Sequence, residues 1–117
     1  MSGKIDFEQI VREISQVVIV LDQELNIVWA NEKAAEVAGT DPVGRKCHKL
    51  YMDKDIPCDG CHTLKTFITG DTIPNTSTVK YEDGRERYFD GFTTVVGRDE
   101  QGRITLVGEI AGEVPKL

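Results

Sequence analysis

The first apolar positions of the chain repeat with the spacing of a helix, in which residues three and four apart share a face. Four residues form this stripe: Phe7, Ile10, Val11 and Ile14. Asp6 stands at the expected N-cap, and Gln9 three residues later completes a capping box. The pattern predicts an amphipathic helical segment within residues 1–16. Its stripe covers the core of its own domain, forms a dimer contact, or links the domain to a neighbouring one, and we predict a homodimer.

Two short apolar runs follow this segment. Val17–Leu21 is rich in β-branched residues and Ile27–Ala30 is similarly apolar, with a polar turn between them. Such a pair predicts a β-hairpin. Asn31 is then a suitable N-cap for a short helix, and Gly39 is a suitable residue to end it.

The second half of the chain changes from turn signals to strand patterns. Residues 40–60 are rich in Gly, Pro and Asp, which predicts loops and short helical turns. A helix is expected at Thr63–Thr69, ended by Gly70. Three strands complete the chain, at Thr76–Glu82, Arg85–Val96 and Arg103–Ala111. Asp83-Gly84 is a strong hairpin signal between the first two.

Strands at both ends of the chain and short helices in the middle predict an α+β domain. We expect a five-stranded antiparallel sheet with the helices covering one face. A sheet covered in this way leaves room for a ligand pocket between the two layers. The predicted pocket residues are Ile19, Leu50, Leu64, Phe67, Phe92 and Leu106.

Composition narrows the classes of partner. With 117 residues the chain has the size of one domain, which can fold without a metal or a disulfide. Its net charge of -6 disfavours nucleic acid and anionic membrane surfaces as partners. No secretory signal and no apolar run long enough to cross a bilayer are visible. We therefore expect a cytoplasmic protein without membrane insertion, with cysteines that are thiols, metal ligands or redox groups.

Several local motifs, taken in order, resemble the PAS domain family. The hairpin of Val18–Asp22 and Leu25–Asn31 resembles the start of a PAS core, where an Asn opens the first core helix. Val43–Lys46 is similar to the loop after that helix, and Phe67–Gly70 to the end of the last core helix. The turns of the last three strands also fit. The resemblance implies a PAS core over residues 17–114, preceded by the segment 1–16.

The resemblance also implies a function. PAS domains are sensory or protein-interaction modules, so we expect a binding module and not an enzyme. They bind haem, flavin or small metabolites, or use the sheet to dimerise. They belong to larger signalling proteins, which implies a fused or partner output domain such as a histidine kinase or a cyclase.

A cluster of cysteine and histidine residues is the most informative local feature. Its members are Cys47, His48, Cys58, Cys61 and His62. The spacing resembles a subgroup of PAS domains with a Cys followed by Pro-Cys-x-x-Cys just before the last core helix. The residues themselves leave several interpretations open.

Two interpretations use the thiols directly. The three cysteines with either histidine could form a tetrahedral site for zinc, or bind iron, although an iron–sulfur cluster usually takes four thiolates. Alternatively, Cys58 and Cys61 could close a reversible disulfide, with Cys47 as another partner. Cys61 just before a helix would be favoured as a thiolate by the helix dipole.

Two further interpretations remain. The run Cys58–His62 matches the Cys-x-x-Cys-His pattern of c-type haem attachment, which normally occurs outside the cytoplasm. The cysteines could instead be small packing residues. The resulting alternative to a sensor is a stand-alone redox or metal-binding protein that uses this motif.

Overall fold

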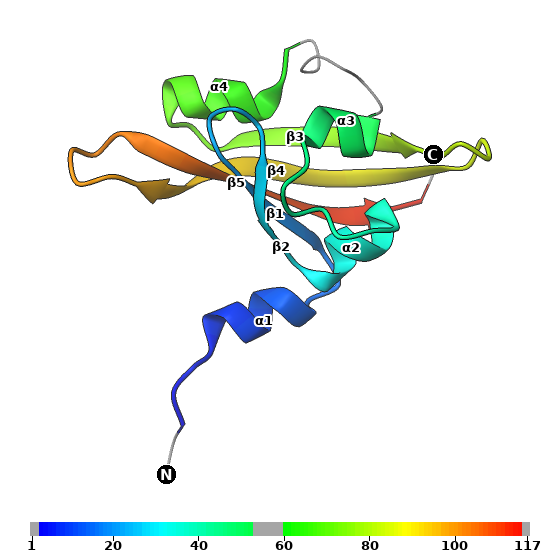
Figure 1. Cartoon of the computed structure of the whole chain (residues 1–117), viewed down its shortest axis with the longest axis horizontal. Helices are drawn as coiled ribbons and strands as arrows, with labels where there is room; N and C mark the ends of the chain where they lie inside the picture. Colours follow the sequence, from blue (N-terminus) through cyan, green and yellow to red (C-terminus); the bar gives the residue numbers. More distant parts are fainter. Residues whose placement is uncertain (1–2, 53–59, 116–117) are drawn as a thin grey trace.

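The computed structural model describes residues 3–52 and 60–115, and within them five strands and four short helices form one layered domain (Figure 1). The elements follow in the order α1 (Phe7–Glu13), β1 (Val17–Leu21), β2 (Ile27–Ala30), α2 (Glu32–Ala38), α3 (Cys47–Met52), α4 (His62–Thr69), β3 (Ile73–Lys80), β4 (Glu86–Arg98) and β5 (Ile104–Val114). The predicted α+β class and antiparallel sheet are confirmed.

The sheet has the strand order β2-β1-β5-β4-β3, and each neighbouring pair is antiparallel. The hairpin β1–β2 is therefore joined to the last three strands through β5, where Ile19 pairs with Glu109. On its other side, Glu109 pairs with Thr93 of β4. The middle of β5 thus lies at the centre of the sheet.

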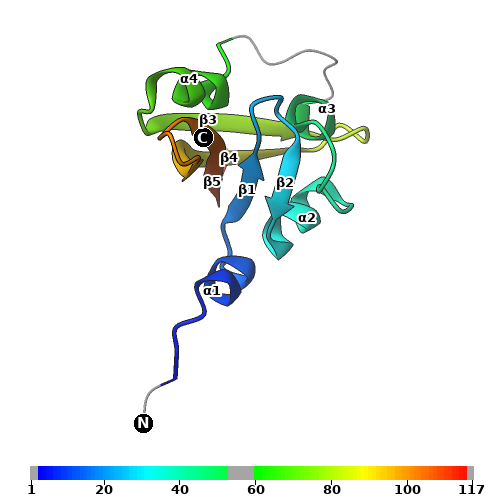
Figure 2. The same ribbon diagram turned by 60° about the vertical axis from the view of Figure 1, so that its left-hand side comes forward.

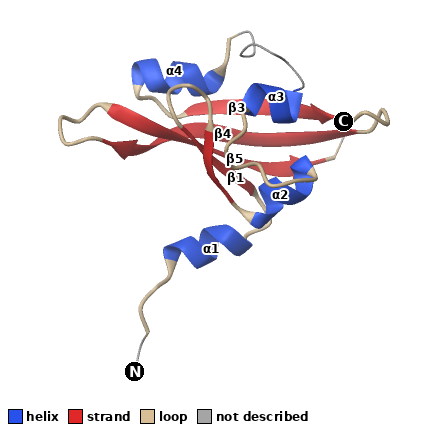
Figure 3. Ribbon diagram, viewed as in Figure 1, coloured by secondary structure: helices blue, strands red, loops and turns tan. Residues whose placement is uncertain are grey.

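The helices cover one face of this sheet. In two views related by a turn, α3 and α4 lie along the same side of it (Figure 1, Figure 2). Figure 3 separates these helices from the strands by colour. Alternation directs Ile19, Val107 and Phe89 toward the helices, and all three are buried. From the helices, Val37 and Tyr51 join the same core.

Asn31 ties three elements together through its side chain. Its Oδ1 accepts from the backbone N–H of Val18 at 3.1 Å and of Ala34 at 3.0 Å. Its Nδ2 donates to the carbonyl oxygens of Val11 at 2.9 Å and Gln16 at 2.8 Å. Asn31 is therefore the predicted N-cap of α2, and it also binds α1 and the chain that enters β1.

The first helix begins as the sequence predicts, because Asp6 accepts a hydrogen bond from the Gln9 N–H at 2.9 Å. Its apolar stripe does not enter the core: Phe7 is 71% exposed and Ile10 is 51% exposed. Figure 1 and Figure 2 show α1 projecting away from the sheet and from α3 and α4. The stripe is thus available to a partner, and the dimer contact stays a prediction.

An ionic cluster fixes α2 against the sheet. The Arg87 guanidinium on β4 contacts Glu36 of α2 at 2.5 Å and Glu113 of β5 at 2.6 Å. Hydrogen bonds from Arg87 and Lys33 lower the pKa of Glu36 to about 2. These contacts hold one end of α2 across the last two strands.

The last three strands are shifted or extended relative to their predicted bounds. β3 begins at Ile73 and contains Pro74, which an edge strand tolerates because one side of it makes no ladder hydrogen bonds. β5 continues to Val114 beside β4. None of the described helices is long and apolar enough to cross a membrane.

Candidate functional site

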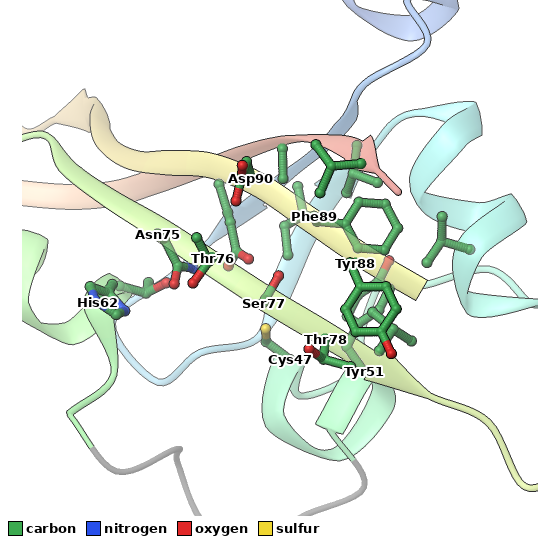
Figure 4. Close-up of a pocket in the computed structure, with 18 of the residues that line it drawn as sticks. Cys47, Tyr51, His62, Asn75, Thr76, Ser77, Thr78, Tyr88, Phe89 and Asp90 are labelled. Carbon is green, nitrogen blue, oxygen red and sulfur yellow. The ribbon is translucent and has the colours of Figure 1, made fainter. Parts of the chain in front are cut away.

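A cavity of about 760 Å³ lies between the helices and the sheet (Figure 4). Its wall comes from β1, α2, α3, α4 and the three C-terminal strands. A volume of this size is within the range of small-molecule sites in proteins. The cavity is therefore the first candidate for a functional site.

Most of the cavity wall is apolar or aromatic. Ile19 and Ala111 contribute from the sheet, Phe89 from β4, and Tyr51 from α3. The Tyr51 hydroxyl is already used, since it donates to the carbonyl oxygen of Ala34 at 2.9 Å. Burial, with smaller contributions from the charges of Cys47 and Glu109, raises the pKa of Tyr51. Tyr51 therefore offers the cavity a neutral aromatic side chain.

Two carboxyl groups, those of Glu109 and the more exposed Asp90, interrupt this apolar wall. Glu109, at the centre of β5, lines the cavity. Burial raises the pKa of Glu109, while a hydrogen bond with the Thr63 side chain acts in the opposite direction. Glu109 is therefore an acidic residue on the wall between the sheet and the helices.

A pair of threonines holds α4 against the sheet beside this group. The hydroxyls of Thr66 and Thr93 lie 2.7 Å apart, and both residues are fully buried. The Thr93 hydroxyl also lies 3.3 Å from the carbonyl oxygen of His62. Buried hydroxyl groups need hydrogen-bond partners. The Thr66–Thr93 pair therefore turns the side of α4 that carries Thr63 and Thr66 toward the sheet.

Two of the predicted thiols line the same cavity. Cys47 begins α3 and Cys61 is the N-cap residue of α4, so they come from different helices. Both are half-buried and both line the cavity. Cys58 lies outside the described residues, so the predicted Cys58–Cys61 pair is not placed.

The two histidines are placed differently. His62 lines the cavity at the start of α4. His48 is buried in α3, and its Nδ1 has no hydrogen-bond partner among the described residues. In the part of the chain that the structure describes, no three His, Cys, Asp or Glu side chains gather as a metal site.

The family of the chain follows from a match that covers nearly all of these elements. A family model for the PAS fold matches residues 11–114. The chain belongs to the PAS-fold family. It is thus a sensory signalling module in the general sense of that family, and the predicted family is confirmed.

Solved structures agree with this PAS assignment at the level of the fold. The PAS domain of nitrogen regulation protein NR(II) from Vibrio parahaemolyticus is 16% identical, with a TM-score of 0.72, and the match covers 94% of this chain and 100% of that one. The Vibrio cholerae VqmA dimer is 19% identical, with a TM-score of 0.71 and coverage of 96% and 52%. An RNA-binding light-oxygen-voltage receptor is 19% identical, with a TM-score of 0.73 and coverage of 97% and 35%.

This PAS domain therefore spans about half of the VqmA chain and about a third of the RNA-binding receptor. VqmA is described as having a target DNA, and the other receptor is described as RNA-binding. These comparisons do not support the expectation that nucleic acid is excluded as a partner. No curated protein matches the chain.

Of the six predicted pocket residues, only Ile19 lies on the cavity wall. The prediction was wrong for Phe92, which is 39% exposed because β4 alternates and directs Phe89 inward. It was wrong for Leu106 as well, since the fully buried Val107 beside it takes the inward position in β5.

The three helical residues of the predicted pocket also lie off the cavity wall. Leu50 and Leu64 are half-buried and pack against the core cluster. Phe67 is half-buried too, because α4 turns Thr63 and Thr66 inward instead. The Thr66–Thr93 hydrogen bond accounts for this orientation.

Sequence reasoning missed Glu109, although a signal was present. Glu109 is two residues from both Val107 and Ala111 in an apolar strand, so alternation places it on their side. A carboxyl group on the buried face of a central strand is unusual.

Proposed function

We propose that this PAS domain is a sensor that binds a small molecule in the cavity between its sheet and its helices. It acts as a binding module and not as an enzyme. The observation that carries the proposal is the cavity itself, large, mainly apolar, and bordered by α3, α4 and the central strands. A cytoplasmic location would keep its cysteines reduced.

A structural neighbour supports the choice of ligand binding. VqmA has been solved bound to DPO, and this structure is 21% identical to the chain, with a TM-score of 0.70 and coverage of 93% of this chain and 58% of that one. The shared fold supports the proposal that a small molecule binds in the cavity of this domain. It does not identify the ligand.

The route by which the signal leaves the domain is part of the proposal. Asn31 joins α1 to β1 and α2, and β1 contributes Ile19 to the cavity wall. A ligand that shifts β1 or α2 would therefore move α1. The exposed stripe on α1 would carry this movement to a second copy in a homodimer, or to an output domain such as a histidine kinase or a cyclase.

Ligand binding can be tested with N-phenyl-1-naphthylamine, a dye that fluoresces in apolar surroundings. We expect saturable binding to the wild-type protein, because the wall is mainly apolar. Ser77→Trp places a large side chain on the cavity wall from the edge strand β3. This variant should weaken dye binding by about tenfold or more, since the indole competes for the same space.

Val28→Trp is the matched control, because Val28 is 43% exposed on β2 and does not line the cavity. It should bind the dye as the wild type does. Equal loss of binding in both tryptophan variants, or no saturable binding by the wild type, would contradict the proposal.

A second candidate function is thiol redox sensing, favoured because Cys47 and Cys61 from two helices border one cavity. A mild oxidant such as a diamide would accept two electrons and two protons as two thiols form one disulfide. Such a bond would tie α3 to α4, or either helix to Cys58. The disulfide would thereby change the shape of the cavity.

Mass spectrometry of intact protein checks this candidate. Treatment of the wild type should remove two hydrogen atoms from its mass, and a reductant should restore them. Cys58→Ser separates the possible pairs: if it still loses two hydrogen atoms, Cys47 and Cys61 are the partners. A wild-type mass that does not change under oxidation excludes the switch.

A further inference from the structure

The cavity wall carries a carboxyl group, Glu109, whose pKa no cationic side chain of the described residues lowers. Glu109 lies at the centre of β5, between Ile19 and Thr93 of the neighbouring strands. Among the influences on the Glu109 pKa, burial raises it and only the Thr63 hydrogen bond lowers it. No positively charged side chain of the described residues contributes. Glu109 is half-buried on the cavity wall, and a carboxyl group partly removed from water costs free energy when it is ionised.

Among the described residues, the other charged side chains on the wall add no buried cation. Of the described wall residues, Lys80 is the only lysine and no arginine is present, and Lys80 is exposed on the edge strand. Asp90, which is also exposed, adds another acid to the rim. Figure 4 places Asp90 and Asn75 on the strands beside His62. An anionic ligand would therefore meet the half-buried Glu109 carboxyl group, and no buried lysine or arginine of the described wall would offset the repulsion.

The aromatic residues of the wall favour a ligand that has a flat apolar part. Tyr51 and Phe89 place two aromatic side chains on the same cavity (Figure 4). The charge of Glu109 contributes to the raised pKa of Tyr51, so the carboxyl group and this ring lie within electrostatic reach. Aromatic side chains attract cations as well as apolar rings.

We propose that the ligand of this cavity is a small molecule with an aromatic or apolar body and a protonated amine, which Glu109 binds through a charge-assisted hydrogen bond. The inference rests on the proposed function, since it names the class of ligand for the same cavity. The bound ammonium group would supply a positive charge beside Glu109, and Thr63 would hold the second carboxyl oxygen or share the first.

Three indole compounds of similar size test this ligand class by isothermal titration calorimetry: tryptamine, tryptophol and indole-3-acetate. They carry an ammonium, a hydroxyl and a carboxylate on the same ring. We expect tryptamine to bind about tenfold more tightly than tryptophol, as one charge-assisted hydrogen bond allows. Indole-3-acetate should bind more weakly than both.

Glu109→Gln keeps the shape of the side chain and removes its charge. It should reduce tryptamine affinity about tenfold, to the level of tryptophol, and leave tryptophol within about twofold of its wild-type value. Glu100→Gln is the matched control, because Glu100 is exposed in the turn before β5 and lies off the cavity wall. Circular dichroism and thermal unfolding would establish that both variants are folded.

The outcomes separate this inference from the proposed function. If indole-3-acetate binds most tightly, or if Glu109→Gln keeps the preference for tryptamine, the ligand class is wrong and the cavity still binds ligands. If none of the indoles binds while the naphthylamine dye does, the inference also fails alone. If the dye fails to bind as well, both the inference and the proposed function are rejected.

Discussion

Replacing Gly91 with alanine is expected to lower the free energy of unfolding by about 3 kcal/mol or more. A Cβ atom at this position of β4 would overlap the carbonyl oxygen of Ile110 and lie 2.6 Å from the Cα of Ala111. Both atoms belong to the backbone of β5, so neither can move away without disturbing the sheet. Urea unfolding followed by the fluorescence of Trp29 measures the effect.

Gly112→Ala is the control for this prediction. A Cβ at Gly112 would meet only the Gln16 side chain, at 3.8 Å, which is an ordinary contact distance. Its free energy of unfolding should stay within about 0.5 kcal/mol of the wild-type value. Equal stability of the two variants would show that β4 and β5 do not approach as closely as described.

The second large effect is expected for Asn31→Ala, with a loss of about 3 kcal/mol in the free energy of unfolding. The substitution removes four hydrogen bonds of a residue that is 2% exposed. Each such bond contributes about 1 kcal/mol on average, and the backbone groups left behind are partly buried. Thermal and urea unfolding would measure the loss.

Asn31→Ser separates the two roles of this side chain. Serine can still cap α2 by accepting from Ala34, but it cannot reach Val11 and Gln16 as the amide does. We therefore expect an intermediate stability and faster proteolysis in residues 7–16. If the alanine variant unfolds like the wild type, the connection between α1 and the core has been misjudged.

The elements that the sequence predicted best are those closed by local caps. Asn31 and Gly39 bound α2, and Gly70 ends α4 with a left-handed backbone. Such signals lie within a few residues of the structure they determine, so periodicity and capping rules suffice to locate them. The hairpin β1–β2 was placed for the same reason.

The cavity wall was predicted poorly because apolar residues on the opposite face of β4 and β5 were taken as the inward ones. Phe92 and Leu106 are apolar, yet Phe89 and Val107 occupy the inward positions of their strands. Alternation from Val107 also places Glu109 inward. The contact between β1 and β5 is a long-range pairing, which no local pattern contains.

The thiol cluster shows a different limit. The spacing of the cysteines in the sequence resembles a PAS subgroup, but it does not give their positions in space. In the structure, Cys47 at the start of α3 and Cys61 before α4 line one cavity. Cys58, which most of the alternatives require, lies outside the described residues. The choice between metal, disulfide, haem and packing therefore depends on chemistry and not on the fold.

The central claim is that a small molecule occupies the space between the sheet and the helices. Titration of isotopically labelled protein with N-phenyl-1-naphthylamine, followed by amide chemical shifts in NMR spectra, tests it most directly. We predict that the largest shifts fall on cavity-wall residues such as Ile19, Tyr51, Phe89 and Glu109. Shifts confined to the exposed surface around Val28 and Val96, with those wall residues unchanged, would contradict the claim.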